Sequence, residues 1–173
     1  MAQQESQQPD SEAASRTVNT ELSVSSGIVV GADGSGTSQQ AVQWAADEAV
    51  LRGCELHAVR AWTMSNAPRP SSWSFGYVPS LQDYEAAVTE LLHRTWSDLA
   101  DRVPGLHLHA IHGDPARILV EGSLGADLVV VGSRGHGRVA EFWLGSVAEQ
   151  VVRAARCPVV VVRPSTSTPI GDV

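Results

Sequence analysis

Four small residues with a fixed spacing are the part of this sequence best suited to do chemistry. Gly132 directly follows a run of three valines, and Gly135 comes three residues later. Nine further residues lead to Gly145 and Ser146, where a segment with helical periodicity starts. Glycine has no Cβ, so the backbone can approach a ligand closely, and a helix start offers unpaired N–H groups and partial positive charge. This spacing therefore predicts a phosphate site.

Strands and helices are expected to alternate along the middle of the chain. Short apolar runs predict strands over 27–32, 54–62, 106–111, 127–131 and 158–162. Periodicity and cap residues predict one helix between an N-cap at Ser38 and a closing Gly53, and others over 81–102, 116–124 and 144–155. Alternation of this kind is typical of βαβ units.

We therefore expect an α/β fold, an open five-stranded parallel sheet with helices on both faces. A strand order of 3-2-1-4-5 would place the reversal of order between the first and fourth strands, where such sheets bind ligands. Glycine-rich turns follow both strands, Asp33-Gly34 after the first and 132–135 after the fourth. The predicted phosphate site and the expected ligand crevice therefore coincide.

Composition and charge limit the classes of function. The chain has 173 residues, of which 43% are hydrophobic and 18% charged, as in ordinary soluble domains. We expect one domain over 25–164, between polar tails at 1–24 and 165–173 that bury too little apolar surface to fold. The net charge of -7 argues against a nucleic-acid partner.

Targeting signals and cysteine usage indicate a compartment. No apolar run approaches the roughly 20 residues of a membrane span, and the N-terminus lacks the basic start and apolar core of a signal peptide. Cys54 and Cys157 form no CxxC motif and indicate neither a disulfide framework nor a metal site. We expect a cytoplasmic protein with no membrane partner.

Three segments of the chain resemble the universal stress protein family. They are IVVGADGS at 28–35, HGDPA at 112–116, and the stretch 132–163, which carries Gly-x2-Gly-x9-Gly-Ser as Gly132, Gly135, Gly145 and Ser146. The resemblance extends over residues 27–164 and implies an adenine nucleotide α-hydrolase-like fold, a homodimer, and ATP in the crevice. With ATP we expect Mg²⁺ or Mn²⁺ bridging the phosphates; AMP or another adenylate is the alternative occupant.

The resemblance also implies which residues bind the nucleotide. Asp33 would accept hydrogen bonds from ribose hydroxyls, while the main chains of Ala32 and Ala61 would contact adenine. The turn after the fourth strand would wrap the ribose and the first phosphates, and the next helix start would hold the outer ones. The full set is Ala32, Asp33, Ala61, Val131, Gly132, Arg134, Gly135, Gly145, Ser146 and Val147. No protein side chain is expected to bind the metal.

Each role has a purely structural alternative. Asp33 can instead open an Asx turn or cap the next helix. The glycines can simply form turns, and Ser146 can simply cap its helix, a role that is compatible with phosphate binding. Arg134 can reach a phosphate, whereas we interpret Arg138 as a solvated loop charge; these two are the only cations of the predicted turn.

Two other motifs are weaker. Gly31-x4-Gly36-Thr37 imitates a P-loop but lacks the lysine that reaches the outer phosphates. His107, His109 and His112 invite comparison with a metal site, and the first two share a strand face. The spacing places no third ligand beside them, so we interpret them as half-exposed histidines of an edge strand.

The last predicted strand indicates how the protein assembles. Pro158–Val162 is apolar and terminal in the sheet, which leaves an open hydrophobic edge. Pairing with a second copy across a two-fold axis would remove this edge, and the universal stress protein dimer, by resemblance, uses this strand. The alternative is that the C-terminal tail folds over it.

Together these features predict a homodimeric, ATP-binding stress or dormancy regulator, in which nucleotide occupancy biases conformation or the choice of an unknown protein partner. The expected crevice offers no general base with a positioned water, so we do not expect an efficient enzyme. A slow ATPase, or another nucleotide-hydrolysing enzyme using the same site, is the first alternative. A nucleotide-free scaffold with structural glycines is the second.

Overall fold

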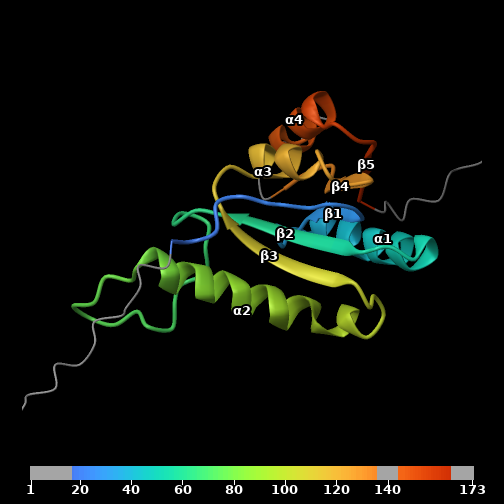
Figure 1. The fold of residues 1–173 in the computed structure, drawn as a ribbon. Coiled ribbons are helices and arrows are strands. Elements are labelled where there is room, and N and C mark those ends of the chain that lie inside the picture. The colour runs from blue at the N-terminus through green and yellow to red at the C-terminus, as the bar shows by residue number, and fades with distance from the viewer. Residues whose placement is uncertain (1–16, 136–143, 165–173) are drawn as a thin grey trace, which may run out of the picture.

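A computed structural model describes residues 17–135 and 144–164 of the chain. Strands and helices alternate throughout this part (Figure 1). The strands are β1 (Ile28–Gly31), β2 (Leu56–Trp62), β3 (Leu106–His112), β4 (Leu128–Gly132) and β5 (Val159–Val162). The helices are α1 (Gly36–Arg52), α2 (Leu81–Ala100), α3 (Pro115–Gly122) and α4 (Ser146–Ala154).

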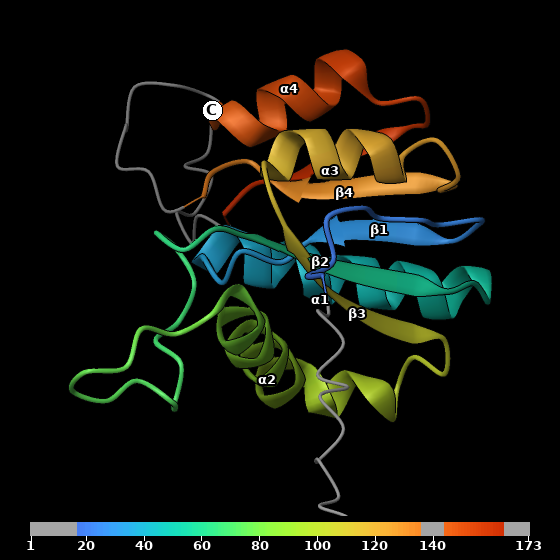
Figure 2. The same ribbon diagram turned by 60° about the vertical axis from the view of Figure 1, so that its left-hand side comes forward.

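All neighbouring strands are parallel, and their order in the sheet is β3-β2-β1-β4-β5. The predicted fold class and strand order are therefore confirmed. Helices α1 and α2 cover one face of the sheet, and α3 and α4 cover the other (Figures 1 and 2). The strand order reverses between β1 and β4. The connections that leave the carboxyl ends of these two strands run to opposite faces of the sheet, and the space between them can hold a ligand.

Two apolar cores, one on each face, hold these layers together. Successive residues of a strand point to opposite faces, so Ile28 and Val30 join the core under α1 and α2, whereas Val29 joins the core under α3 and α4. On α1, alanines at every fourth position are fully buried, which brings this helix close to the sheet. No helix in the described ranges combines the length and apolar character needed to cross a membrane.

The structure corrects two predicted helix starts. Ser35, not Ser38, is the N-cap of α1: its backbone is extended, and its side chain accepts a hydrogen bond from the Ser38 amide. Helix α4 begins at Ser146, two residues later than predicted, because Gly145 occupies the extended N-cap position. Both starts lie next to the ligand crevice, so their geometry bears on function.

The structure also corrects the boundary of the N-terminal tail, predicted to extend to residue 24. Val18 and Leu22 are buried, and the carbonyl of Asn19 accepts a hydrogen bond of 2.7 Å from the His112 amide. A Cβ on Gly125 would lie 1.7 Å from the Val24 carbonyl oxygen, so a bare backbone is needed there. Val18 packs into the core under α1 and α2, whereas Leu22 packs into the core under α3 and α4, so both cores hold this segment against the domain. The remaining tail residues, 1–16 and 165–173, lie outside the described residues.

Candidate nucleotide site

A cavity of about 450 Å³ opens at the carboxyl ends of β1, β2 and β4; we call it the strand-end cavity. Every residue predicted for the site lines it. These residues are Ala32, Asp33, Ala61, Val131, Gly132, Arg134, Gly135, Gly145, Ser146 and Val147. The structure thus gathers four segments that are distant in the sequence around one space.

The turn after β1 fixes the Asp33 carboxylate at the cavity wall. Gly34 adopts a positive φ of 87°, a conformation that glycine tolerates best. Asp33 Oδ1 then accepts a hydrogen bond of 2.9 Å from the Ser35 amide. The Asx turn considered as an alternative for Asp33 is therefore present. Such a bond leaves further lone pairs on the carboxylate, so the turn is compatible with ligand binding by the same side chain.

The turn after β4 packs tightly against the turn after β1, and its glycines make this possible. A Cβ on Gly135 would lie 2.8 Å from Asp33 Oδ2, and one on Gly132 would lie 2.9 Å from the Thr37 carbonyl carbon. The Thr37 hydroxyl donates a hydrogen bond to the Arg134 carbonyl and joins the two turns. Gly132 and Gly135 therefore have a structural role, whatever the cavity binds.

Gly145 differs from the other two glycines. A Cβ there would meet its nearest neighbours at 3.5 Å, an ordinary contact distance, and its φ of -72° suits any residue. Its amide donates a hydrogen bond of 2.7 Å to the Ser133 carbonyl, which brings the start of α4 back to the turn after β4. Neither steric crowding nor backbone conformation requires a glycine at this position.

The first turn of α4 has no side-chain cap. Gly145 is the N-cap and has no side chain, and Ser146 is the first helical residue; the interpretation of Ser146 as a capping residue is therefore wrong. The amides of an uncapped first turn keep their hydrogen-bonding capacity and their partial positive charge. Because Ser146, Val147 and Ala148 all line the cavity, this capacity is available there.

Sequence analysis missed Arg60, which joins Arg134 as a cation at the cavity among the described residues. This side chain extends from β2 and is only 9% exposed. One terminal nitrogen donates a hydrogen bond of 3.3 Å to the Asn66 carbonyl, while Nε is buried with no hydrogen-bond partner among the described residues. Burial lowers the pKa of Arg60, and the nearby Asp33 carboxylate opposes that shift. An arginine inside a largely apolar strand was the signal that could have revealed it.

The other predicted cations are placed differently. Arg134 lines the cavity and is exposed, so its side chain can reach a bound anion from solvent. Arg138 lies outside the described residues. Apolar side chains of Val59, Pro115 and Leu119 form another part of the wall. The cavity therefore combines an apolar wall, one carboxylate, two guanidinium groups and a helix start among the described residues.

The sequence model of the universal stress protein family matches residues 26–163. The chain belongs to the universal stress protein family. The match covers all five strands and all four helices described here, so the whole strand-end cavity lies inside the family domain. The resemblance inferred from the three motifs is confirmed.

Similar proteins agree with this membership. Universal stress protein Rv2005c of Mycobacterium tuberculosis is 41% identical over 138 residues, which are 80% of this chain and 45% of that protein. The chain thus spans just under half the length of this relative. Universal stress protein UspA from Lactobacillus plantarum has the same fold, with a TM-score of 0.62 and 21% identity over 82% of this chain and all of that one.

A third similar protein was solved with a ligand. It is a universal stress protein in complex with cAMP, with a TM-score of 0.56 and 27% identity over 83% of this chain and 100% of that chain.

Proposed function

We propose that this universal stress protein domain binds an adenine nucleotide, ATP with Mg²⁺ or Mn²⁺, in the strand-end cavity. The observation that carries the proposal is the uncapped N-terminus of α4, which meets two glycine turns at the point where the strand order reverses. The adenine nucleotide bound by a solved family member at 27% identity supports the choice of ligand class.

The cavity wall suggests how the nucleotide would lie. Adenine would occupy the apolar part beside Val59 and Leu119, with its polar edge toward the main chains of Ala32 and Ala61. The ribose would face Asp33, whose carboxylate accepts hydrogen bonds from hydroxyls. The phosphates would then extend along the turn after β4 to the first amides of α4, where a negative charge is most favourable.

We propose regulation rather than turnover as the use of this nucleotide. Asp33 is the only carboxylate among the described residues that line the cavity, and one of its oxygens is held by the Ser35 amide. A base that activates water needs a free position next to the outermost phosphate, whereas Asp33 would lie at the ribose. A slow ATPase and a nucleotide-free scaffold remain the two alternatives.

We further propose that the domain forms a homodimer through β5. This strand is the last of the sheet, and its outer edge has no partner strand within the described ranges. All four of its valines are only half-buried. Antiparallel pairing with the same strand of a second copy would satisfy this edge and cover these side chains.

Calorimetric titration and ligand release test the nucleotide proposal. The purified protein is denatured, the supernatant is chromatographed against ATP, AMP and cAMP standards, and nucleotide-free protein is then titrated with each adenylate and with GTP. We expect micromolar affinity for an adenylate, about -8 kcal/mol, and a higher melting temperature in its presence. An absence of both binding and a thermal shift would favour the scaffold, whereas steady ATP turnover far above background would favour the ATPase.

A further inference from the structure

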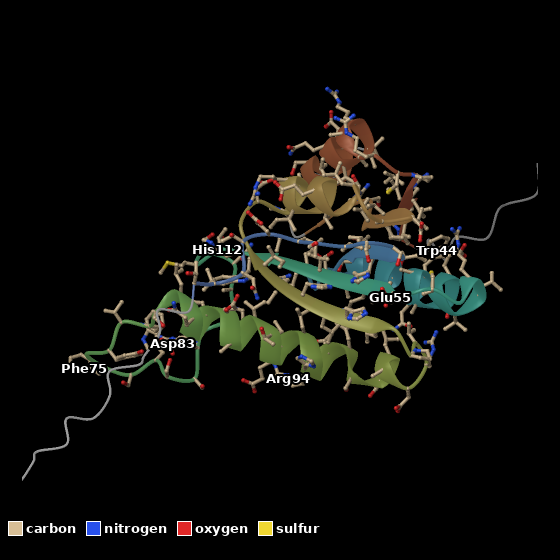
Figure 3. The ribbon with its side chains drawn as sticks, in the orientation of Figure 1. Trp44, Glu55, Phe75, Asp83, Arg94 and His112 are labelled. Atoms are coloured by element: carbon tan, nitrogen blue, oxygen red, sulfur yellow. The ribbon has the colours of Figure 1, made fainter. Side chains whose placement is uncertain are left out.

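Four polar side chains gather at the amino ends of β2 and β3; we call them the histidine cluster. They are Glu55, His57, His107 and His109. Figure 3 shows Glu55 toward one end of these strands and His112 at the other, carboxyl end. The histidine cluster is therefore separate from the strand-end cavity, and none of its members lines that cavity.

The pairing of β2 with β3 brings the cluster together. His57 lies directly opposite His107, and His109 lies opposite Val59. Odd-numbered residues of both strands therefore share one face, the face on which Val59 packs with α3. The rings of His57 and His107 stack with their centroids 4.8 Å apart. Sequence spacing alone could not supply this contact, because the two histidines are on strands separated by α2.

The Glu55 carboxylate lies beside the two stacked rings, near the Nε2 atom of each. Its Oε1 is 3.6 Å from His107 Nε2, and its Oε2 is 3.6 Å from His57 Nε2. These distances are too long for hydrogen bonds. Two ligand atoms that share a tetrahedral zinc ion lie about 3.4 Å apart, given bond lengths near 2.1 Å. The ligand atoms of all three residues lie within 4.8 Å of one another, so small side-chain rotations suffice to surround one ion.

The two ring nitrogens of His57 differ: Nε2 has no hydrogen-bond partner among the described residues, whereas Nδ1 has one. The residue is 6% exposed, and its Nε2 is buried with no hydrogen-bond partner among the described residues. Its Nδ1 lies 3.0 Å from His109 Nε2. When Nδ1–H donates to His109, the lone pair of His57 is on Nε2 and points toward Glu55. A metal-binding histidine almost always has such a partner on its other nitrogen, which fixes its tautomer and orientation.

We propose that Glu55, His57 and His107 bind one divalent transition-metal ion, for which zinc is the best match. Two imidazoles and a carboxylate are a donor set that zinc accepts, and water would complete the tetrahedral site. His109 is a positioning residue, which acts on the metal through His57. Glu55 and His107 are exposed, so the ion can enter from solvent, while the buried His57 anchors it.

Titration of the metal-free protein with Zn²⁺, on a chain without a polyhistidine tag, tests this proposal. We expect one ion per chain and a rise in melting temperature. His57→Gln, His107→Gln and Glu55→Gln should each weaken binding at least tenfold. His93→Gln is the matched control, because this exposed histidine of α2 lies outside the cluster, and it should leave zinc affinity unchanged. His107 is also exposed, so its variant should fold even if His57→Gln does not.

A pair of variants at His109 tests the positioning role. His109→Leu removes the acceptor for His57 Nδ1–H and should weaken zinc binding by about 10- to 100-fold. His109→Gln offers an amide oxygen near the same place and should restore most of the affinity. An absence of zinc binding by the wild-type chain would overturn the proposal. Equal zinc affinity in wild type and His107→Gln would also overturn it.

Discussion

The Asp33 side chain makes a structural contact in the turn after β1 and also has a proposed role in nucleotide binding. Its Oδ1 holds the Ser35 amide, and its Oδ2 lies where a Cβ on Gly135 would intrude. Asparagine keeps an oxygen for the Ser35 amide but can replace the second carboxylate oxygen with a donor. Asp33→Asn should therefore keep the turn while it weakens ribose recognition, whereas a substitution by alanine would remove both contacts.

We expect Asp33→Asn to weaken ATP binding about tenfold or more, because a hydrogen bond to a charged group contributes about 1.5–3 kcal/mol. The preference for ATP over 2′-deoxy-ATP should also shrink, since the carboxylate would no longer accept from the ribose. Calorimetry with both nucleotides measures this preference, and circular dichroism checks the fold. An unchanged affinity would assign Asp33 to the turn alone.

At the scale of elements, the start of α4 is where charge should decide binding. A Cβ on Gly145 meets no close neighbour, and both aspartate and asparagine are good N-caps. Gly145→Asp and Gly145→Asn therefore differ mainly in one negative charge. Gly135 is less suitable for this test because its Cβ would lie 2.8 Å from Asp33.

We expect Gly145→Asp to abolish measurable ATP binding and Gly145→Asn to retain at least tenfold more affinity than the aspartate variant. The aspartate would place its charge where the phosphates are proposed to lie. Both variants should remain folded, with melting temperatures near that of the wild type. Similar ATP affinity in the wild type and the aspartate variant would show that the nucleotide does not use this helix start.

Helix α2 provides a test of pH dependence at the same scale. Ser80 and Asp83 form a capping box, in which the Asp83 carboxylate accepts a hydrogen bond of 2.7 Å from the Ser80 amide. The same carboxylate accepts a second hydrogen bond, of 2.9 Å, from the Tyr77 hydroxyl. The Ser80 contacts, chiefly its amide, lower the pKa of Asp83 from its ordinary value of 3.8. A carboxylate with a lowered folded-state pKa stabilises the fold above its unfolded-state value, and this contribution is lost as the pH falls.

Asp83→Asn should therefore lower the melting temperature at neutral pH, and the difference from wild type should shrink as the pH falls below about 4. Asp98, an exposed residue near the other end of α2, provides the control, because Asp98→Asn removes a charge without removing a cap. Thermal unfolding across this pH range gives the comparison. A difference that stays constant with pH would mean that the Asp83 charge contributes nothing to the cap.

At the scale of the whole molecule, β5 decides whether the domain pairs with itself. The carbonyls of Pro158 and Val162 accept hydrogen bonds from β4. Alternation along a parallel strand then turns the N–H of Val161 outward, away from β4. Proline is tolerated at such positions of an edge strand, so Val161→Pro removes a donor that only a partner molecule would use.

We expect Val161→Pro to convert the homodimer to a monomer at micromolar concentration with little loss of fold. Val161→Thr keeps the N–H and should remain dimeric. Light scattering after size exclusion measures the mass of each variant. A proline variant with the mass of a dimer would place the interface elsewhere, and a monomeric wild type would refute self-pairing altogether.

The sequence by itself determined the fold class, the strand order and ten of the residues that line the strand-end cavity. The alternation of strands and helices follows from local signals, namely apolar runs and helical periodicity, each within one segment. The strand order and the roles of the site residues follow from the family resemblance that the glycine-spaced motif carries. The Gly132 to Ser146 spacing could therefore be interpreted before any contact was known. Even the error at Ser38 was local, since Ser35 is an equally good cap three residues earlier.

Only the tertiary structure decided which distant residues meet. Arg60 lies near enough to Asp33 to interact electrostatically because β2 lies beside β1, and Val18 and Leu22 are buried because each packs into one of the two apolar cores of the folded domain. The contact of Glu55 and His57 with His107 depends on the register of β2 against β3. A shift of one residue would turn one row of histidines to the other face. Strand register is a property of the packed sheet, so these contacts could not be predicted from the spacing of residues within one segment.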